Sequence, residues 1–286
     1  MGKWKKWLSA GLFTAMLGTA IIAGPTADVS ANAGNKPYNI ENVSPDAQLA
    51  PSVGDSSSKT SSKAWHKIDG VCYNGSGKKV EGAITRGMDV SEWQGKINWK
   101  EAKKDLDFAF VRISYGTRHL DDYYDYNMTE AEAADVPVGT YVYSLAKTNK
   151  EALAEAQLAI RQMQGHKVSY PVAFDLEDEA TLGTLTRKEI SQIALTFCDE
   201  IRKAGYTPIL YMNLNWYNNF VDWNVLEGSG LDVWIASYGD TIFAPSTSKY
   251  KYTIWQCTAG DEVPGMISTK KLISGCLLYT SPSPRD

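Results

Sequence analysis

From residue 84 onward, short apolar runs alternate with longer segments whose apolar residues recur every three or four positions. The runs typical of strands are Ala109 to Ser114, Val138 to Tyr143, Val172 to Phe174, Pro208 to Met212 and Val233 to Ala236. The helical pattern covers Lys150 to Met163 and Arg187 to Ala204. Strands alternating with helices predict parallel βαβ units, and their number favours an α/β fold of the (β/α) barrel type.

Polar and aromatic side chains gather where these runs end. They are Asp89, Ser114, Tyr143, Glu177, Asn213 and Tyr238. Because (β/α) barrels keep their active sites at the carboxyl ends of the strands, we expect the functional site there.

The segment Pro171 to Glu177 carries the sharpest chemical signal. Its apolar run ends in Asp175 and Glu177, which one leucine separates. On a strand, residues i and i+2 face the same side, so both carboxyl groups would point at one spot. Two converging carboxyl groups are what glycoside hydrolysis requires. The alternative is a strand that ends in an acidic loop, because Asp178 and Glu179 follow directly.

Together with a second acidic strand end, this segment resembles glycoside hydrolase family 25, the N-acetylmuramidase type of lysozyme. The resemblance runs from about Ile84 to Ile267 and rests on several motifs in order. They are Arg86 to Gly95, Phe110 to Ser114, Asp121, Asn127, Gly139 to Ser144, Asp175 to Glu177, Gly205 to Tyr211, Asp232 to Tyr238 and Ile254 to Gln256. The family implies an irregular TIM-like barrel with some helices short or missing.

The resemblance assigns the general acid to Glu177. Asp175 would stabilise the oxocarbenium-like transition state or a reacting group of the substrate, and Asp89 would orient a partner or the substrate. Asp89 could instead cap a helix in an acidic turn. The stereochemical course stays open, because carboxyl separations of about 5–5.5 Å and about 6.5–9.5 Å indicate retaining and inverting enzymes respectively.

Aromatic residues on the later strands are candidates for a sugar-binding wall, since aromatic rings are common in ligand sites but also fill cores. They are Tyr141, Tyr143, Trp234, Tyr238 and Trp255. Barrel core is the alternative for each of them. Arg112 could pair with the catalytic acids and keep one ionised, or belong to a buried structural ion pair.

The first 33 residues predict export. Residues 1–33 have the basic start, apolar stretch and small-residue cleavage site of a signal peptide, with an uncleaved membrane anchor as the alternative. Residues 34–63 have the composition of a flexible linker. We expect a secreted protein, possibly associated with the cell wall, that has no stable membrane association after cleavage.

Residues 64–83 predict a β-hairpin with a glycine-containing turn. It resembles one cell-wall-binding repeat of the kind found in choline-binding proteins. A lone repeat cannot bury its own apolar face, so a brace packed on the barrel is the favoured alternative. The catalytic barrel would then occupy residues 84–273.

The end of the chain departs from the family pattern. Residues 274–286 lack the acid that the family carries near its last strand, and Cys276 to Asp286 resembles a translated sequencing adapter. We therefore expect a non-native tail outside the core and a barrel without its final strand, with a divergent native tail as the alternative. Pro282 and Pro284 would exclude a central strand.

Charge and cysteine content exclude several function classes. A formal net charge of −4 provides no electrostatic footprint for nucleic acid. The four cysteines (Cys72, Cys198, Cys257 and Cys276) predict no disulfide framework, because Cys198 and Cys257 fall in core patterns. Three histidines without a CxxC motif argue against a metal site, and we expect no cofactor.

The leading hypothesis is a secreted, monomeric muramidase. It would hydrolyse the β-1,4 bond between N-acetylmuramic acid and N-acetylglucosamine in the glycan strands of peptidoglycan. The alternatives are a non-catalytic wall-binding protein and a hydrolase of another N-acetylated glycan such as chitin.

Overall fold

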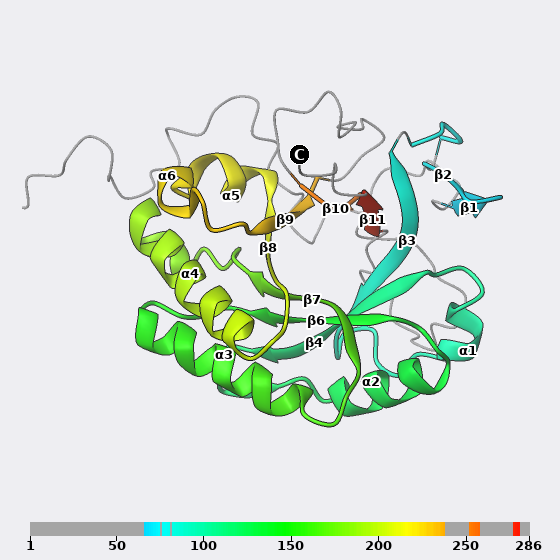
Figure 1. Cartoon of the computed structure of the whole chain (residues 1–286), viewed down its shortest axis with the longest axis horizontal. Helices are drawn as coiled ribbons and strands as arrows, with labels where there is room; N and C mark the ends of the chain where they lie inside the picture. Colours follow the sequence, from blue (N-terminus) through cyan, green and yellow to red (C-terminus); the bar gives the residue numbers. More distant parts are fainter. Residues whose placement is uncertain (1–65, 75, 81, 238–251, 258–276, 281–286) are drawn as a thin grey trace, which may run out of the picture. The chain divides into compact units, whose positions relative to one another are not determined.

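The computed structural model describes residues 66–74, 76–80, 82–237, 252–257 and 277–280. The predicted signal peptide and linker lie outside these residues. The described part has a mixed α/β fold in which a nine-stranded sheet curls around a packed interior (Figure 1). No helix within it has the length and apolarity needed to cross a membrane.

Eight strands of the sheet form a closed ring, because β3 pairs with β4 on one side and with β11 on the other. In ring order they are β3 (Ala83–Val90), β4 (Phe108–Tyr115), β6 (Val138–Tyr143), β7 (Val168–Asp175), β8 (Pro208–Asn213), β9 (Asp232–Ala236), β10 (Ile254–Gln256) and β11 (Leu277–Thr280). The pairs from β3 to β10 are parallel, whereas β11 is antiparallel to both neighbours. A short strand, β5 (His119–Leu120), pairs with the end of β4. The TIM-like barrel is therefore confirmed.

The expectation that the final strand is missing is wrong. Leu278 lies opposite Trp255 of β10 and Arg86 of β3, so β11 fills the gap between them. The four residues of β11 precede both prolines, and no missing amide interrupts the ladder. Only residues 277–280 of the tail are described, and these residues are the closing strand rather than a segment outside the barrel.

Helices cover the outer side of β3 to β9 (Figure 1). They are α1 (Trp99–Ala102), α2 (Tyr124–Ala133), α3 (Asn149–Met163), α4 (Arg187–Lys203), α5 (Leu214–Asn219) and α6 (Trp223–Leu226), with one 3-10 turn, η2 (Leu182–Thr184). The two predicted helices correspond to α3 and α4. Helix α4 begins at a capping box, in which Thr186 accepts from the amide of Glu189 and the Glu189 carboxylate accepts from Thr186.

Strict alternation along the strands separates two cores. Outward residues of β3 to β8, such as Met88, Phe174 and Met212, pack beneath α2, α3 and α4. Inward residues fill the barrel, and Phe108 and Phe110 occupy the half of the interior near the amino ends of the strands. A Cβ at Gly87 would lie 2.5 Å from the Phe108 ring, and one at Gly139 would lie 2.6 Å from the Phe110 ring. These glycines make room for the aromatic plug, which leaves the carboxyl-end half of the barrel for polar residues.

The N-terminal hairpin packs against the barrel. Its strands β1 (His66–Ile68) and β2 (Val71–Tyr73) are joined by a tight turn in which Gly70 has a φ of 80°. Cys72 and Val80 are buried in one cluster with Val233, Ile235, Trp255 and other residues of the outer faces of β9 and β10. The brace alternative for the hairpin is the one that the packing supports.

Candidate active site

Tyr143, Asp175, Tyr211 and Trp234 form one row across β6 to β9, because each lies opposite the next in the strand register. All four are on the inward face, above the aromatic plug. The polar residues of this row are therefore concentrated in the carboxyl-end half of the barrel, as the strand ends predict.

Asp175 and Glu177 share a face of β7, as their spacing predicts. Between them, the Leu176 amide donates to the carbonyl of Tyr211 at 3.0 Å, so the extended backbone continues beyond the last strand residue. The Leu176 side chain is fully buried in the outer core. This packing turns the two carboxyl groups toward the interior, and the reading of this segment as a loose acidic loop is wrong for Asp175 and Glu177.

The environment of these acids favours their protonated forms. Burial raises the pKa of Glu177 to about 7, and the neighbouring carboxylates of Asp89 and Asp178 add to the shift. Asn213 opposes it through a long hydrogen bond of 3.5 Å from Nδ2 to Glu177 Oε2. Burial, and then the charges of Glu177 and Asp89, raises the pKa of Asp175 well above its usual range. Among the described protein groups, Asp175 Oδ1 is buried without a hydrogen-bond partner.

Asp89 reaches the same site from β3. Gln256 of β10 donates to Asp89 Oδ1 at 3.0 Å, and Tyr211 donates its hydroxyl proton to Gln256 Oε1 at 2.9 Å. The structure gives Asp89 no role in capping a helix, since the caps of α1 and α2 are Asn98 and Tyr123. Asp89 therefore belongs with Asp175 and Glu177, as predicted.

Gln256 and Tyr211 are site residues that sequence reasoning missed. Alternation along β10 contained the signal, because Ile254 and Gln256 face one side of the strand and Trp255 faces the other. Because Gln256 and Trp255 must face opposite sides, the polar Gln256 was the better candidate for the polar interior.

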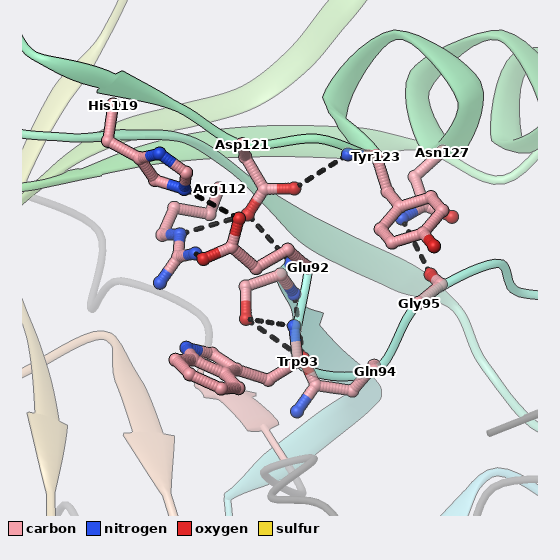
Figure 2. Close-up of polar contacts among 10 residues, drawn as sticks. Glu92, Trp93, Gln94, Gly95, Arg112, His119, Asp121, Tyr123 and Asn127 are labelled. Carbon is pink, nitrogen blue, oxygen red and sulfur yellow. Dashed lines mark hydrogen bonds and ion pairs between the residues drawn. The ribbon is translucent and has the colours of Figure 1, made fainter. Parts of the chain in front are cut away.

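Arg112 belongs to a separate ion-pair network at the end of β4 (Figure 2). Its Nε donates to Asp121 Oδ2 at 2.9 Å, and its Nη2 lies 2.8 Å from Glu92 Oε1. His119 Nε2 is 2.7 Å from the other oxygen of Glu92. The Arg112 side chain is only 7% exposed, so the alternative of a buried structural pair is confirmed. Its positive charge still lowers the pKa of Asp175, although burial outweighs it.

This network holds the loop that follows β3. Asp121 Oδ2 also accepts the Glu92 amide at 2.7 Å (Figure 2). The buried Asn127 donates to the Gly95 carbonyl at 3.2 Å (Figure 2). It also accepts from the Trp99 indole at 3.2 Å. Asp121 and Asn127, which the sequence placed in a connecting segment, thus fix the backbone that leaves Asp89.

Three of the predicted aromatic residues face the barrel interior. Trp234 is packed between Phe110 and Tyr211, at ring-centroid distances of 4.6 and 4.5 Å, and Tyr141 lies edge-on to it. Burial, and then the charge of Asp89, raises the pKa of the Tyr141 hydroxyl, which therefore stays protonated. Tyr143 donates to Asp178 Oδ2 at 3.3 Å.

The assignment of Trp255 to the sugar-binding wall is wrong. Its side chain is 2% exposed and packs on the outer face with Val233 and Cys72, while its indole donates to the Ser237 carbonyl at 2.9 Å. Alternation turns it outward because Gln256 turns inward. Tyr238 lies outside the described residues.

A buried glutamate on α3 supports the site from the outer side of the sheet. Glu155 of α3 is 2% exposed and accepts from the Ser144 hydroxyl at 2.8 Å and the Leu145 amide at 3.0 Å. The Ser144 amide in turn donates to the Asp175 carbonyl at 3.0 Å. Burial raises the pKa of Glu155 to about 7. The described residues contain no group of His, Cys, Asp and Glu suited to a metal ion.

Comparison with known proteins identifies this arrangement. Residues 88–266, which include all three acids, match the model of the glycosyl hydrolases family 25. The chain belongs to this family. Among curated relatives, this family 25 chain is 25% identical over 191 residues to lysozyme M1 of Streptomyces globisporus, a match that covers 63% of this chain and 64% of that protein. It is also 25% identical over 194 residues to the uncharacterized protein YegX of Escherichia coli K12, covering 63% and 65%.

The family 25 chain thus spans less than two-thirds of the length of these relatives. Solved structures have the same fold. A family 25 glycosyl hydrolase from Bacillus anthracis superposes with a TM-score of 0.59 at 22% identity, covering 77% of this chain and 94% of that one. The autolysin LytC of Streptococcus pneumoniae, solved with a synthetic peptidoglycan ligand, has a TM-score of 0.61 at 22% identity, covering 75% and 52%.

Proposed function

We propose that this protein is a muramidase that hydrolyses the β-1,4 bond between N-acetylmuramic acid and N-acetylglucosamine in peptidoglycan. The observation that carries the proposal is Glu177, a carboxyl group with a pKa of about 7 beside Asp175 and Asp89. A general acid must hold its proton at the working pH and still be able to release it, and a pKa near neutrality satisfies both needs.

In this mechanism Glu177 donates its proton to the glycosidic oxygen as the bond to the anomeric carbon breaks. Positive charge then develops on the sugar ring beside Asp175 and Asp89, which lie on the inward face. This charge favours the ionised form of each carboxyl group, and the carboxylates stabilise it. Asp175 Oδ1, without a protein partner, is available to a polar group of the substrate. After the leaving group departs, a water molecule adds its oxygen to the anomeric carbon and gives its proton to the Glu177 carboxylate, which restores the acid.

The names of the relatives support peptidoglycan as the substrate, since one is a lysozyme and another was solved with a peptidoglycan ligand. The proposal includes export through the predicted signal peptide, action as a monomer and glycan strands as the partner. The non-catalytic alternative does not explain why three acids are held at one place where the pKa values of Asp175 and Glu177 are raised, since acids that stay ionised would suit binding better.

Analysis of the digestion products tests the proposal. Purified cell walls are digested, the new reducing ends are reduced with borohydride, and the fragments are identified by mass spectrometry. We expect reduced muramic acid at the new ends. Reduced glucosamine or cleaved peptide cross-links would contradict the assignment, and a lack of cleavage together with wall binding would support the non-catalytic alternative.

A further inference from the structure

Exposed apolar side chains are concentrated at the mouth of the barrel. The large hydrophobic residues that are exposed in the described part are Ile68, Ile84, Trp93, Tyr115 and Leu120. The last three lie beyond β3, at the end of β4 and on β5, which all belong to the carboxyl-end side of the barrel. Trp93 is 58% exposed, the largest fraction among them. Single exposed apolar residues are ordinary, but a group of them beside an active site marks a binding surface.

The loop that carries Trp93 is held rigidly. The Ser91 amide donates to Gln94 Oε1 at 2.7 Å, and the Trp93 amide donates to Ser91 Oγ at 3.3 Å. The Gly95 amide closes the turn onto the Glu92 carbonyl at 3.1 Å. Figure 2 shows the Trp93 ring extending away from the contacts of the Glu92 carboxylate. The indole is therefore presented by an ordered backbone, so little conformational entropy is lost when a ligand covers it.

A continuous row of side chains joins this loop to the general acid. His119 Nε2 contacts Glu92 Oε2 at 2.7 Å, and His119 lies opposite Tyr115 in the β4–β5 pair. Tyr115 stacks on Tyr143 at 4.8 Å and donates its hydroxyl proton to Asp178 Oδ2 at 3.3 Å. Asp178 is the residue directly after the general acid. The exposed surface is thus an extension of the catalytic site.

We propose that this row is a subsite for one sugar ring of the glycan strand, beyond the two rings on each side of the scissile bond. The inference rests on the proposed function. The Trp93 indole would stack on the apolar C–H face of the ring, and the carboxylates of Glu92 and Asp178 would accept hydrogen bonds from its hydroxyl groups. These carboxylates favour a neutral, hydroxyl-rich sugar over the stem peptide, whose own carboxylates they repel.

Kinetics on glycan strands of two lengths test the subsite. Strands freed of stem peptides by an amidase are separated into tetrasaccharides and chains of roughly ten or more sugars. Trp93→Ala should raise KM on the long strands about tenfold, the effect of losing one aromatic contact, while kcat stays within about twofold. The tetrasaccharide should show no such difference, because it need not reach the subsite. Trp93→Phe should retain most of the affinity, and Ile84→Ala, an exposed apolar residue at the other end of β3, is the matched control.

An unchanged KM of Trp93→Ala on long strands would overturn the subsite. So would an equal loss on the tetrasaccharide, which would place Trp93 at the cleavage point, or a loss confined to strands that keep their peptides. If the wild-type protein cleaves no peptidoglycan, the proposed function fails on its own. Calorimetric titration of the long strands into Glu177→Gln, with and without Trp93→Ala, then decides the subsite: weaker binding of the double variant supports it, and equal binding overturns it.

Discussion

Gln256 donates a hydrogen bond of 3.0 Å to Asp89, a residue 167 positions earlier in the chain. Because the Tyr211 hydroxyl donates to the other end of the same amide at 2.9 Å, the orientation of the Gln256 side chain is set from both sides. The Asp89 carboxylate therefore receives a donor whose direction is fixed by the opposite wall of the barrel. Gln256 thus acts as a positioning residue for Asp89.

Replacing Gln256 with methionine should impair catalysis while preserving the fold. The variant keeps the length of the side chain but loses the donor, so kcat should fall about tenfold, which corresponds to one lost hydrogen bond to a charged group. Unchanged kcat would show that Asp89 needs no such support.

Neutral amides in place of the catalytic acids should separate activity from stability. Glu177→Gln should lower wall hydrolysis at least about a hundredfold, in line with the contribution of a general acid, and Asp175→Asn should be severely impaired as well. Both variants should melt at or above the wild-type temperature, because each removes a buried, mutually repelling acid. Turbidity of purified walls and calorimetry provide the two measurements. More than half of the wild-type activity in Glu177→Gln would remove Glu177 from the mechanism.

Activity should decline as the pH rises through about 7, because the general acid then loses its proton. This decline with rising pH should be absent from the residual activity of Glu177→Gln. A profile of kcat/KM between pH 4 and 9 gives the measurement, and a plateau that continues unchanged to pH 9 would contradict the assigned pKa.

Stability should decline as the pH rises from about 4.3 to about 7. Glu177 and Glu155 have folded-state pKa values of about 7, above the value of about 4.3 for an unfolded glutamate. The folded state therefore binds more protons between these pH values, and the free energy of unfolding falls as pH rises through them. Melting temperatures at pH 5 and pH 8 should differ in that direction, and Glu155→Gln should reduce the difference. An equal difference in Glu155→Gln would show that Glu155 is not its source.

Trp255→Ala should destabilise the protein without removing its chemistry. The indole is buried between the outer faces of the strands and the hairpin, so its loss should lower the free energy of unfolding by about 3 kcal/mol or more. At a temperature where the variant stays folded, kcat should match the wild type. Tyr141→Phe, which removes a hydroxyl from the inner face, provides the contrast: its activity should fall while its melting temperature changes little. The reverse outcome would place Trp255 in the site.

Two C-terminal truncations test the closing strand. Removing residues 276–286 deletes β11 and leaves the edges of β3 and β10 unpaired, so melting temperature and solubility should both fall. Removing only residues 281–286 keeps the strand and should leave both unchanged. If the two truncated proteins behave alike, β11 contributes nothing to the stability of the barrel.

The local patterns of this sequence predicted the fold and the acids well, for identifiable reasons. Amphipathic spacing marked α3 and α4, and the i, i+2 spacing of Asp175 and Glu177 put both on one face because β7 is extended beyond its last residue. Family resemblance, which the matching family model confirms, added Asp89.

The errors arose where position depends on distant parts of the chain. Trp255 is an aromatic residue next to the site in sequence, but only the pairing of β10 with β9 and β11 decides which face it takes. The partners of Arg112 are Glu92, in the loop after β3, and Asp121, directly after β5. No local sequence pattern predicts these pairs. For β11, the prolines at positions 282 and 284 predicted an irregular tail, but the four β-prone residues before them form a strand.

The position of β11 also governs when the barrel can form. Leu277 pairs with Gly87, so the ring closes only by bringing together residues from opposite ends of the barrel sequence. Contacts between such distant residues form late, because the entropy of the intervening chain must be lost first. A chain still emerging from the ribosome can build β4 to β8 and their helices, but it holds an open sheet until β11 arrives. The arrival of β11, rather than the appearance of the acids, is therefore the event that creates the enclosed site.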